Sequence, residues 1–252
     1  MLDELEIIMS SYKLQIENLC FEYVKNEPIL QGINIRANEQ ENIGIIGANG
    51  AGKSTLLKLI VGLNLNFTGQ IKVDDVCVEK KTLSQIRQRI GYVFQEPANQ
   101  LFMTNVHSEI AFAPQNYGMS KEQTNRLVNE AMRKVHIEHL KDRSVYKLSD
   151  GEKKLVSIAA VLSIRPSIIL MDEPSSTLDP RNRRNLIGLL NEFDGLKIIT
   201  SHDLDFIWDT CQRTILINNG RIVADGNTQD ILRNKKVLEE NGLELPLSLI
   251  RR

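Results

Sequence analysis

The chain has 252 residues, enough for one large α/β domain or two small ones. Its 31 basic and 32 acidic residues nearly cancel, so its overall charge gives no general attraction to nucleic acid, and we expect no nucleic-acid partner. The three cysteines, Cys20, Cys77 and Cys211, lie too far apart for a metal site and are expected to be unreactive structural thiols in a reducing cytosol.

The N-terminal residues 1–11 are acidic, whereas a signal peptide begins with basic residues. No apolar run approaches the roughly 18 residues that a bilayer-spanning helix needs. We therefore expect that the chain by itself neither crosses a membrane nor leaves the cytosol. Docking on a membrane protein stays open.

The first part of the chain predicts strands around one helix. Residues 13–19 and 70–78 alternate apolar and polar side chains, as half-buried strands do. Residues 42–46 form a short apolar run that leads into glycines, which is typical of a buried parallel strand. Residues 53–62 carry apolar side chains at helical spacing, and residues 90–94 predict a further apolar strand.

The stretch from about 100 to 165 predicts a helical insertion. Ser120 and Gln123 match a capping box, and apolar positions at helical spacing follow within 127–135. After the first turn, residues 152–164 are apolar on nearly every side, which indicates a buried helix.

Strands and helices alternate again from residue 168 onward. An apolar strand ends at two acids, and a polar helix, the strand 196–200, a helix through Trp208 and a hairpin within 214–223 follow. The whole pattern predicts an α/β fold in which a helical insertion interrupts a parallel core sheet.

One loop matches the phosphate-binding pattern G-x-x-x-x-G-K-[ST] in full. It comprises Gly47, Ala48, Asn49, Gly50, Ala51, Gly52, Lys53 and Ser54. Glycines let backbone N–H groups converge on phosphate oxygens, and the N-terminus of the following helix favours the same anion. Lys53 supplies a charge to the β- and γ-phosphates, and the Ser54 hydroxyl suits Mg²⁺. The alternative is a chance match, which the preceding strand and the following helix disfavour.

Two acids, Asp172 and Glu173, follow the apolar run 168–171. They therefore lie at the carboxyl end of a strand, where open α/β sheets bind ligands. Asp172 suits coordination of Mg²⁺, and Glu173 suits the general base that polarises the attacking water. The alternative is that both acids cap the next helix through Pro174.

From about residue 13 to residue 233 the chain resembles an ABC-transporter ATPase. Six motifs stand in the family's order: the phosphate loop GANGAGKST, Gln95 of the glutamine loop, LSDGE at 148–152, MDEP, the D-loop STLD ending at Asp179, and His202 in TSHD. The resemblance implies a P-loop NTPase of the ABC-ATPase type with a mainly parallel core sheet, an antiparallel β subdomain and the helical insertion. It implies one ATPase domain over 1–252, with a short tail at 234–252.

The same resemblance implies an ATPase that uses ATP and Mg²⁺ and works with a second ABC ATPase chain. Lys53, Glu173 and His202 would be catalytic, with His202 on the γ-phosphate bound in cis. Gln95 would ligate Mg²⁺ together with Ser54 and Asp172, and would sense the membrane subunits. Residues implied to bind ATP are Tyr23, Gly47, Ala48, Asn49, Gly50, Ala51, Gly52, Lys53, Ser54, Thr55 and Gln95. Tyr23 would stack on adenine; its alternative is an aromatic side chain of a strand in the core.

In this family two cassettes pack head to tail, so the signature residues Ser149, Asp150, Gly151 and Glu152 would serve the partner's nucleotide. Asp150 replaces the first glycine of the signature, and Leu155 stands where many relatives have arginine. At ~6 Å from a phosphate and an effective dielectric constant of about 20, the repulsion is roughly 3 kcal/mol per charge pair. Ser149 and Glu152 still match a capping box. The direction of the Asp150 side chain, and with it the choice of homodimer or heterodimer, stays open.

Residues 94–119 contain the pattern Q-x-P-x-x-Q-L-F and, after it, V-x-x-E-I-A-F-A-P-x-N. They resemble the energy-coupling-factor group, in which a glycine stands at the position of Ala113. The resemblance implies an integral membrane coupling subunit, a substrate-binding membrane subunit, and a peripheral position on the cytoplasmic side of the cell membrane. The tail GLELPLSL is more similar to cobalt and nickel importers than to vitamin importers. No cluster of His or Cys is available for the cargo ion, so its selectivity would lie in a partner.

Two other classes compete with the transporter hypothesis. A soluble ABC ATPase of iron–sulfur assembly fits the architecture, whereas repair members carry long coiled coils and translation factors carry two cassettes. A non-hydrolysing ATP-binding module conflicts with the presence of both Glu173 and His202.

Overall fold

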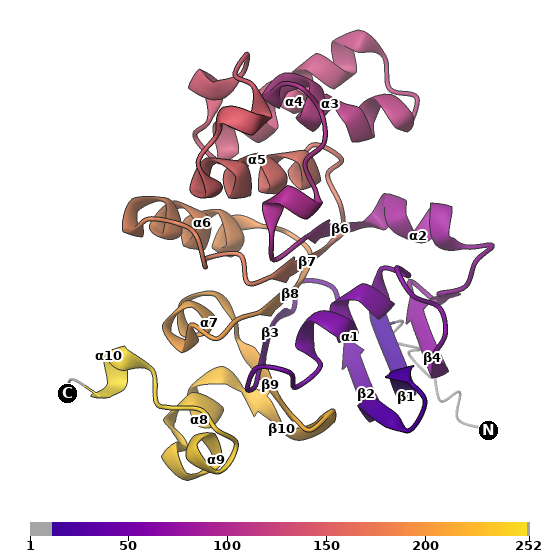
Figure 1. Cartoon of the computed structure of the whole chain (residues 1–252), viewed down its shortest axis with the longest axis vertical. Coiled ribbons are helices and arrows are strands. Elements are labelled where there is room, and N and C mark those ends of the chain that lie inside the picture. Colours follow the sequence, from indigo (N-terminus) through magenta and orange to yellow (C-terminus); the bar gives the residue numbers. More distant parts are fainter. Residues whose placement is uncertain (1–11, 251–252) are drawn as a thin grey trace, which may run out of the picture.

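The computed structural model describes residues 12–250, so the prediction made from the acidic segment 1–11 lies outside the described residues. A four-stranded antiparallel sheet has the order β2-β1-β4-β5. Its strands are β1 (Leu14–Val24), β2 (Glu27–Ala37), β4 (Thr68–Val73) and β5 (Val76–Cys77). This sheet is the predicted antiparallel β subdomain, and it lies beside the core sheet (Figure 1).

The core sheet has six strands in the order β10-β9-β3-β8-β7-β6. Their bounds are β3 (Asn42–Ile46), β6 (Ile90–Val93), β7 (Ile168–Asp172), β8 (Leu196–Thr200), β9 (Arg213–Asn218) and β10 (Arg221–Asn227). Every neighbouring pair in it is parallel except β9 with β10, which form the predicted hairpin. The predicted fold class, a mainly parallel core sheet with an antiparallel subdomain, is confirmed.

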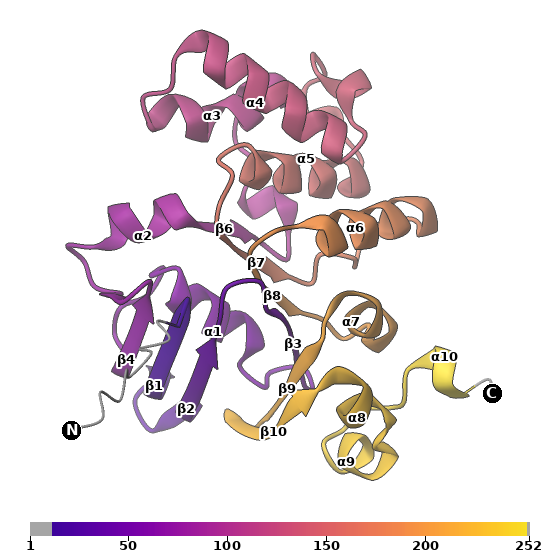
Figure 2. The same ribbon diagram turned by 180° about the vertical axis from the view of Figure 1, so that it is seen from behind.

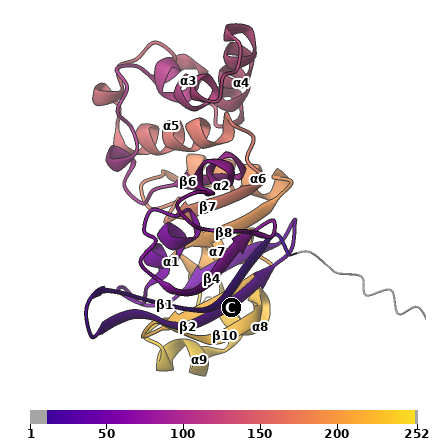
Figure 3. The same ribbon diagram turned by 90° about the vertical axis from the view of Figure 1, so that its right-hand side faces the viewer.

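The described residues form ten α-helices. They are α1 (Lys53–Ile60), α2 (Leu83–Arg89), α3 (Val106–Asn116), α4 (Lys121–Lys134), α5 (Asp150–Leu162), α6 (Pro180–Glu192), α7 (Leu204–Thr210), α8 (Thr228–Arg233), α9 (Lys235–Glu240) and α10 (Leu247–Ile250). The helices α3, α4 and α5 form the predicted helical insertion at one end of the molecule, and α8 and α9 lie at the other end (Figures 2 and 3). Within residues 12–250 no helix combines the length and the apolar character that crossing a bilayer requires.

The core sheet is buried on both faces, which explains its continuous apolar strands. In β7, Ile168 and Leu170 pack in one cluster with α1 and the antiparallel sheet. The alternate residues Ile169 and Met171 pack in a second cluster with the helical insertion and with α6 and α7. The carboxyl end of β7 therefore lies between two apolar clusters. Asp172 and Glu173 follow the last apolar residue of the strand, where both clusters end.

Both predicted capping boxes are present. Ser120 accepts the N–H of Gln123 at 3.2 Å and Ser149 accepts the N–H of Glu152 at 3.3 Å. In return, the Gln123 and Glu152 side chains accept the backbone N–H of the capping serines. The capping box at Ser149 fixes the start of α5 at the signature.

The segment 70–78 is not one strand, although its alternation predicts one. Asp74 and Asp75 have φ values of 46° and 61°, so the chain turns there and returns as β5. Short acidic side chains tolerate this left-handed conformation better than most residues. The apolar positions shift at the turn from Ile71 and Val73 to Val76 and Val78, and all four side chains pack on the same core cluster.

Candidate active site

The phosphate loop runs from β3 into α1, and its glycines are required by geometry. Gly47 has a φ of 149°, and a Cβ added there would lie 2.1 Å from the carbonyl oxygen of Ile217. Gly52 has a φ of 102°, and its Cβ would lie 2.7 Å from a methyl group of Leu30. Only glycine allows this backbone at such close approach, and in a glycine-rich loop of this kind backbone N–H groups can converge on an anion.

Lys53 begins α1 and folds back over the loop. Its Nζ atom donates to the carbonyl oxygens of Gly47 at 2.7 Å and Ala48 at 3.1 Å. Burial lowers the pKa of Lys53, while the nearby carboxylates of Glu173 and Asp172 oppose that shift. The lysine charge is therefore held in a confined space between the loop and the acid pair.

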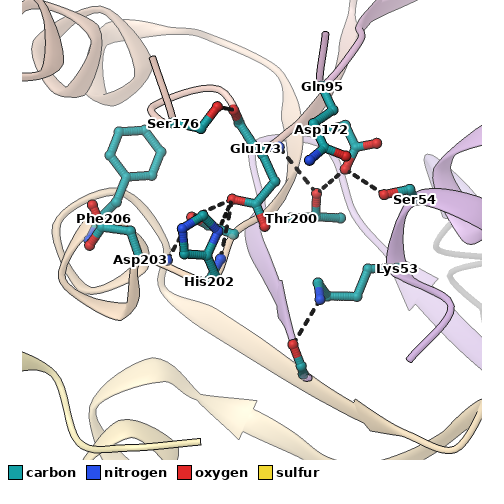
Figure 4. Close-up of polar contacts among 12 residues, drawn as sticks. Lys53, Ser54, Gln95, Asp172, Glu173, Ser176, Thr200, His202, Asp203 and Phe206 are labelled. Atoms are coloured by element: carbon teal, nitrogen blue, oxygen red, sulfur yellow. Dashed lines mark hydrogen bonds and ion pairs between the residues drawn. The ribbon is translucent and has the colours of Figure 1, made fainter. Parts of the chain in front are cut away.

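Asp172 is contacted by hydroxyl groups from three elements, and Figure 4 shows two of them, those of Ser54 and Thr200. Its Oδ1 atom accepts the hydroxyl of Ser54 at 2.8 Å and that of Thr200 at 2.7 Å. The hydroxyl of Tyr92 lies 3.5 Å from Oδ2. Burial, followed by the charge of Asp172, raises the pKa of Tyr92 above its usual range, so this hydroxyl stays neutral. Hydroxyl and carboxylate oxygens are donors that Mg²⁺ prefers, so this set fits that ion.

Glu173 lies at the end of β7 in the left-handed region, with a φ of 47°. Its Oε2 atom lies 2.8 Å from Nδ1 of His202 and accepts the backbone N–H of His202 at 3.3 Å (Figure 4). Ser201 also donates to this oxygen, at 3.3 Å. The carboxylate is thus held by groups that follow β8, the neighbouring strand.

The alternative reading of the acid pair, as caps of the next helix, is wrong. Helix α6 begins only at Pro180, and Asp179 is its cap. The Asp179 carboxylate accepts the N–H groups of Arg181 and Asn182, both at 2.9 Å. Neither Asp172 nor Glu173 is used by a helix end, so both remain for other chemistry.

A cavity of about 270 Å³ joins the phosphate loop to Gln95 and Glu173. Its lining residues are Ile29, Asn49, Gly50, Ala51, Gly52, Lys53, Ser54, Thr55, Gln95 and Glu173. A larger hollow of about 610 Å³ lies between the antiparallel sheet, around Cys20, and Arg221 of β10. The smaller cavity is the one that contains the loop, Lys53 and Glu173.

Tyr23 lies beside this cavity and not in the core. Its side chain is 59% exposed, and its hydroxyl is 3.4 Å from that of Thr55. The ring packs edge-on against Phe21, with centroids 4.7 Å apart. The reading of Tyr23 as a core aromatic is therefore excluded, and a face of the ring remains free for a flat ligand.

The signature lies at the N-terminus of α5, away from the cavity. Ser149, Asp150, Gly151 and Glu152 are not among the described residues that line the cavity. The Asp150 side chain is 78% exposed and pairs with Lys153 at 3.4 Å. One copy of the chain thus brings the loop, the acids, Gln95 and His202 together, and leaves the signature separate.

Two contributors to the site escaped the sequence analysis, Thr200 and Tyr92. Thr200 ends the strand 196–200 and comes two residues before His202, so its position at the carboxyl end of β8 was a signal. Tyr92 stands within an apolar strand and gave no signal, because its hydroxyl reaches Asp172 only through the pairing of β6 with β7.

Comparison with known proteins agrees with this geometry. A family model described as ABC transporter matches residues 30–176. A putative ABC transporter ATP-binding protein of Geobacter sulfurreducens is 43% identical and covers 96% of this chain and 97% of that protein. The energy-coupling factor transporter ATP-binding protein EcfA of Carboxydothermus hydrogenoformans is 37% identical, and the match covers 93% of this chain and 87% of that protein. The solved structure of CbiO1 from Clostridium perfringens, part of the ABC transporter complex CbiONQ, has a TM-score of 0.80 at 33% identity, covering 96% of this chain and all of that one.

Proposed function

Because this chain belongs to the ABC transporter family, whose ATP-binding subunits hydrolyse ATP, we propose that it powers a membrane importer of the energy-coupling-factor type. The observation that carries the proposal is the convergence of the phosphate loop, Glu173 and Gln95 on one cavity. The predicted resemblance to ABC ATPases, and to the energy-coupling-factor group among them, is confirmed by these relatives. The soluble alternative finds no support among them.

The phosphates of ATP would lie on the backbone of the loop 47–52. Lys53 would turn from the carbonyl oxygens of the loop to the β- and γ-phosphates, because an anion outcompetes two neutral acceptors for its charge. The adenine ring of ATP would stack on the exposed face of Tyr23, next to Thr55. Stacking on one aromatic side chain fixes the orientation of adenine without a closed pocket.

We propose that Ser54, Asp172 and Gln95 hold Mg²⁺, directly or through water. When bound, the ion neutralises charge on the phosphates and orients them. The donor set fits, because Ser54 and Asp172 are already in contact at 2.8 Å and Gln95 lines the same cavity. No group of three or more His, Cys, Asp or Glu side chains suited to a metal occurs within residues 12–250. A site of few protein ligands shared with phosphates is typical of Mg²⁺.

Glu173 would act as the general base of hydrolysis. Its Oε2 atom is held by His202 and Ser201, which leaves Oε1 to accept a hydrogen bond from the attacking water. The His202 side chain is 67% exposed, so it can also reach the γ-phosphate bound to the same chain. Positioning and charge stabilisation by these groups would be the main contribution of the protein, because the loose transition state of phosphoryl transfer leaves it little covalent chemistry to do.

The site is complete only in a pair of cassettes. Ser149 and Gly151, which lie outside the cavity of their own chain, would contact the γ-phosphate on the partner chain. Either a second copy or a different ABC ATPase chain can supply the reciprocal signature. ATP-driven pairing and hydrolysis-driven separation would then do the mechanical work of import.

A surface of the helical insertion would receive the membrane partner. After Gln95, the segment 100–102 buries Leu101 and leaves the Phe102 side chain 55% exposed. Phe102 packs edge-on against Phe112 at 4.7 Å. We propose that an apolar helix end of an integral membrane coupling subunit docks there. The chain would thus sit peripherally on the cytoplasmic side of the membrane, and a further membrane subunit would bind the cargo.

We propose a cobalt or nickel ion as cargo, ahead of a vitamin. The support is the tail at 242–249, whose sequence GLELPLSL is more similar to cobalt and nickel importers than to vitamin importers. The ATPase chain would confer no selectivity for the ion, which the substrate-binding membrane subunit would provide. Uptake of radioactive cobalt and nickel by vesicles that hold the native complex tests this choice.

Cross-linking tests the docking surface directly. A photoreactive group on Phe102→Cys in membranes of the native host should attach the chain to a hydrophobic integral protein. Val223→Cys, which is 49% exposed on β10 far from the insertion, is the matched control and should give no such product. If Phe102→Cys attaches only to soluble proteins, the transporter proposal is wrong and iron–sulfur assembly becomes the better account.

A further inference from the structure

A lysine lies buried beneath the segment that carries Gln95. Lys154 is on α5, its side chain is fully buried, and its Nζ atom donates to the carbonyl oxygens of Phe94 at 3.0 Å and Gln95 at 2.6 Å. Burial lowers the pKa of Lys154 to about 8, although Asp172 and Glu173 act in the opposite direction. A buried cation is costly unless it is well paired, so its place on two successive carbonyls calls for an explanation.

Gln100 makes a second link between the same two segments. Its Oε1 atom accepts the backbone N–H of Phe94 at 3.2 Å, and its Nε2 atom donates to the carbonyl oxygen of Ser157 at 3.1 Å. Both ends of the amide are thus used, one on the segment before Gln95 and one on α5. This gives a structural role to the glutamine that opens the segment 100–102.

We propose that Lys154, assisted by Gln100, is a positioning residue that fixes the backbone of Gln95 to α5 and so couples the signature helix to the Mg²⁺ site. Ser149, at the start of α5, is five residues from Lys154, which is about 7.5 Å along a helix. Contact of the signature with the partner's nucleotide would therefore shift the carbonyl of Gln95 as part of the same rigid body. The inference rests on the proposed role of Gln95 as a Mg²⁺ ligand.

The chain contains a matched control for this lysine. Lys197, on β8, is 1% exposed and also donates to a backbone carbonyl oxygen, that of Leu190. Its acceptor belongs to α6 and not to the segment of Gln95. Replacement of either lysine by methionine removes a buried ammonium group that donates to backbone carbonyl oxygens. Only the replacement of Lys154 frees the Gln95 backbone.

The experiment measures Mg²⁺ affinity by calorimetry, in protein saturated with a non-hydrolysable ATP analogue. Lys154→Met should weaken Mg²⁺ binding about tenfold, as loss of a group supporting a metal ligand does, and Gln100→Leu should weaken it by a smaller factor. Affinity for the analogue without Mg²⁺ should stay within about twofold. In a Gln95→Ala background, Lys154→Met should change Mg²⁺ affinity by less than about twofold, because the two residues act as one unit. Lys197→Met should lower the melting temperature but keep Mg²⁺ affinity.

Contrary outcomes separate the two proposals. If Lys154→Met keeps its full effect without Gln95, or if Lys197→Met weakens Mg²⁺ equally, the coupling inference is wrong while Gln95 remains a ligand. If Gln95→Ala itself leaves Mg²⁺ affinity unchanged, the ligand role fails and the inference falls with it. Should Lys154→Met not fold, Gln100→Leu asks the same question, and unchanged Mg²⁺ affinity in that variant overturns the inference.

Discussion

The Nδ1 atom of His202 lies 2.8 Å from the Oε2 atom of Glu173. The two residues follow neighbouring parallel strands, β8 and β7, so the contact depends on the pairing of those strands. It holds one oxygen of the carboxylate and leaves the exposed imidazole close to where a γ-phosphate would lie. A general base that is fixed before ATP binds needs no reorganisation during the reaction.

Replacement of Lys53 by alanine should weaken ATP binding by about tenfold to a hundredfold, the range for loss of a charge-assisted hydrogen bond. The reason is that Lys53, whose Nζ atom lies on the loop carbonyl oxygens of Gly47 and Ala48, would face the β- and γ-phosphates. Lys58→Ala, on the same helix, is the control and should bind ATP as the parent chain does. Calorimetry measures both; equal affinities would mean that the loop does not hold the phosphates.

Replacement of Asp150 by glycine should change turnover by less than about twofold. The carboxylate is 78% exposed and paired with Lys153, so its charge is both solvated and offset where the partner's nucleotide would approach. Steady-state ATPase measurement on the paired cassettes is the test. A several-fold increase would show that the carboxylate points at the phosphate.

In a heterodimer, that increase would appear only at the site built on the partner's phosphate loop. It would then vanish when the partner's own catalytic glutamate is replaced. If the increase occurs, this second measurement decides between a homodimer, in which both sites contain the acid, and a heterodimer, in which one does.

Replacement of Glu109 by leucine should weaken docking on the membrane partner. The buried Glu109 carboxylate accepts the N–H groups of Phe102 at 2.9 Å and Met103 at 2.7 Å, and so holds the loop that presents Phe102. Loss of this acceptor should cost about 1–3 kcal/mol of stability. Recovery of the membrane partner on purification should fall, while ATP affinity stays unchanged. The exposed Glu122→Leu should have neither effect; normal recovery with Glu109→Leu would contradict the role of the loop.

The sequence predicted best those parts of the site that are built from neighbouring residues. The strand 42–46, the phosphate loop and the start of the helix at Lys53 follow one another along the chain, so their pattern could be read locally. The capping box at Ser149 is equally local. These elements determine their own conformation through glycine φ angles and side-chain caps.

The remaining contributors depend on contacts between distant segments. Lys154 meets Gln95 across 59 residues of chain, and Thr200 meets Asp172 across 28. In each pair, the sequence around one residue contains no pattern from which its contact with the other residue could be predicted. The strand β2 and the helix α2 were missed for a different reason, because their patterns are short. Only the second half of β2 alternates, at Ile33, Ile35 and Ala37, and α2 has seven residues with Ile86 as its buried side chain.

The most direct test of the account is the turnover of Glu173→Gln. The substitution keeps the size of the side chain and removes the base, so hydrolysis should fall by about a hundredfold or more, while ATP affinity stays within about twofold. With hydrolysis blocked, an ATP-bound pair of cassettes should accumulate and should be visible by size-exclusion chromatography. Turnover equal to that of the parent chain, with no trapped pair, would contradict the assignment of Glu173 and the mechanism built on it.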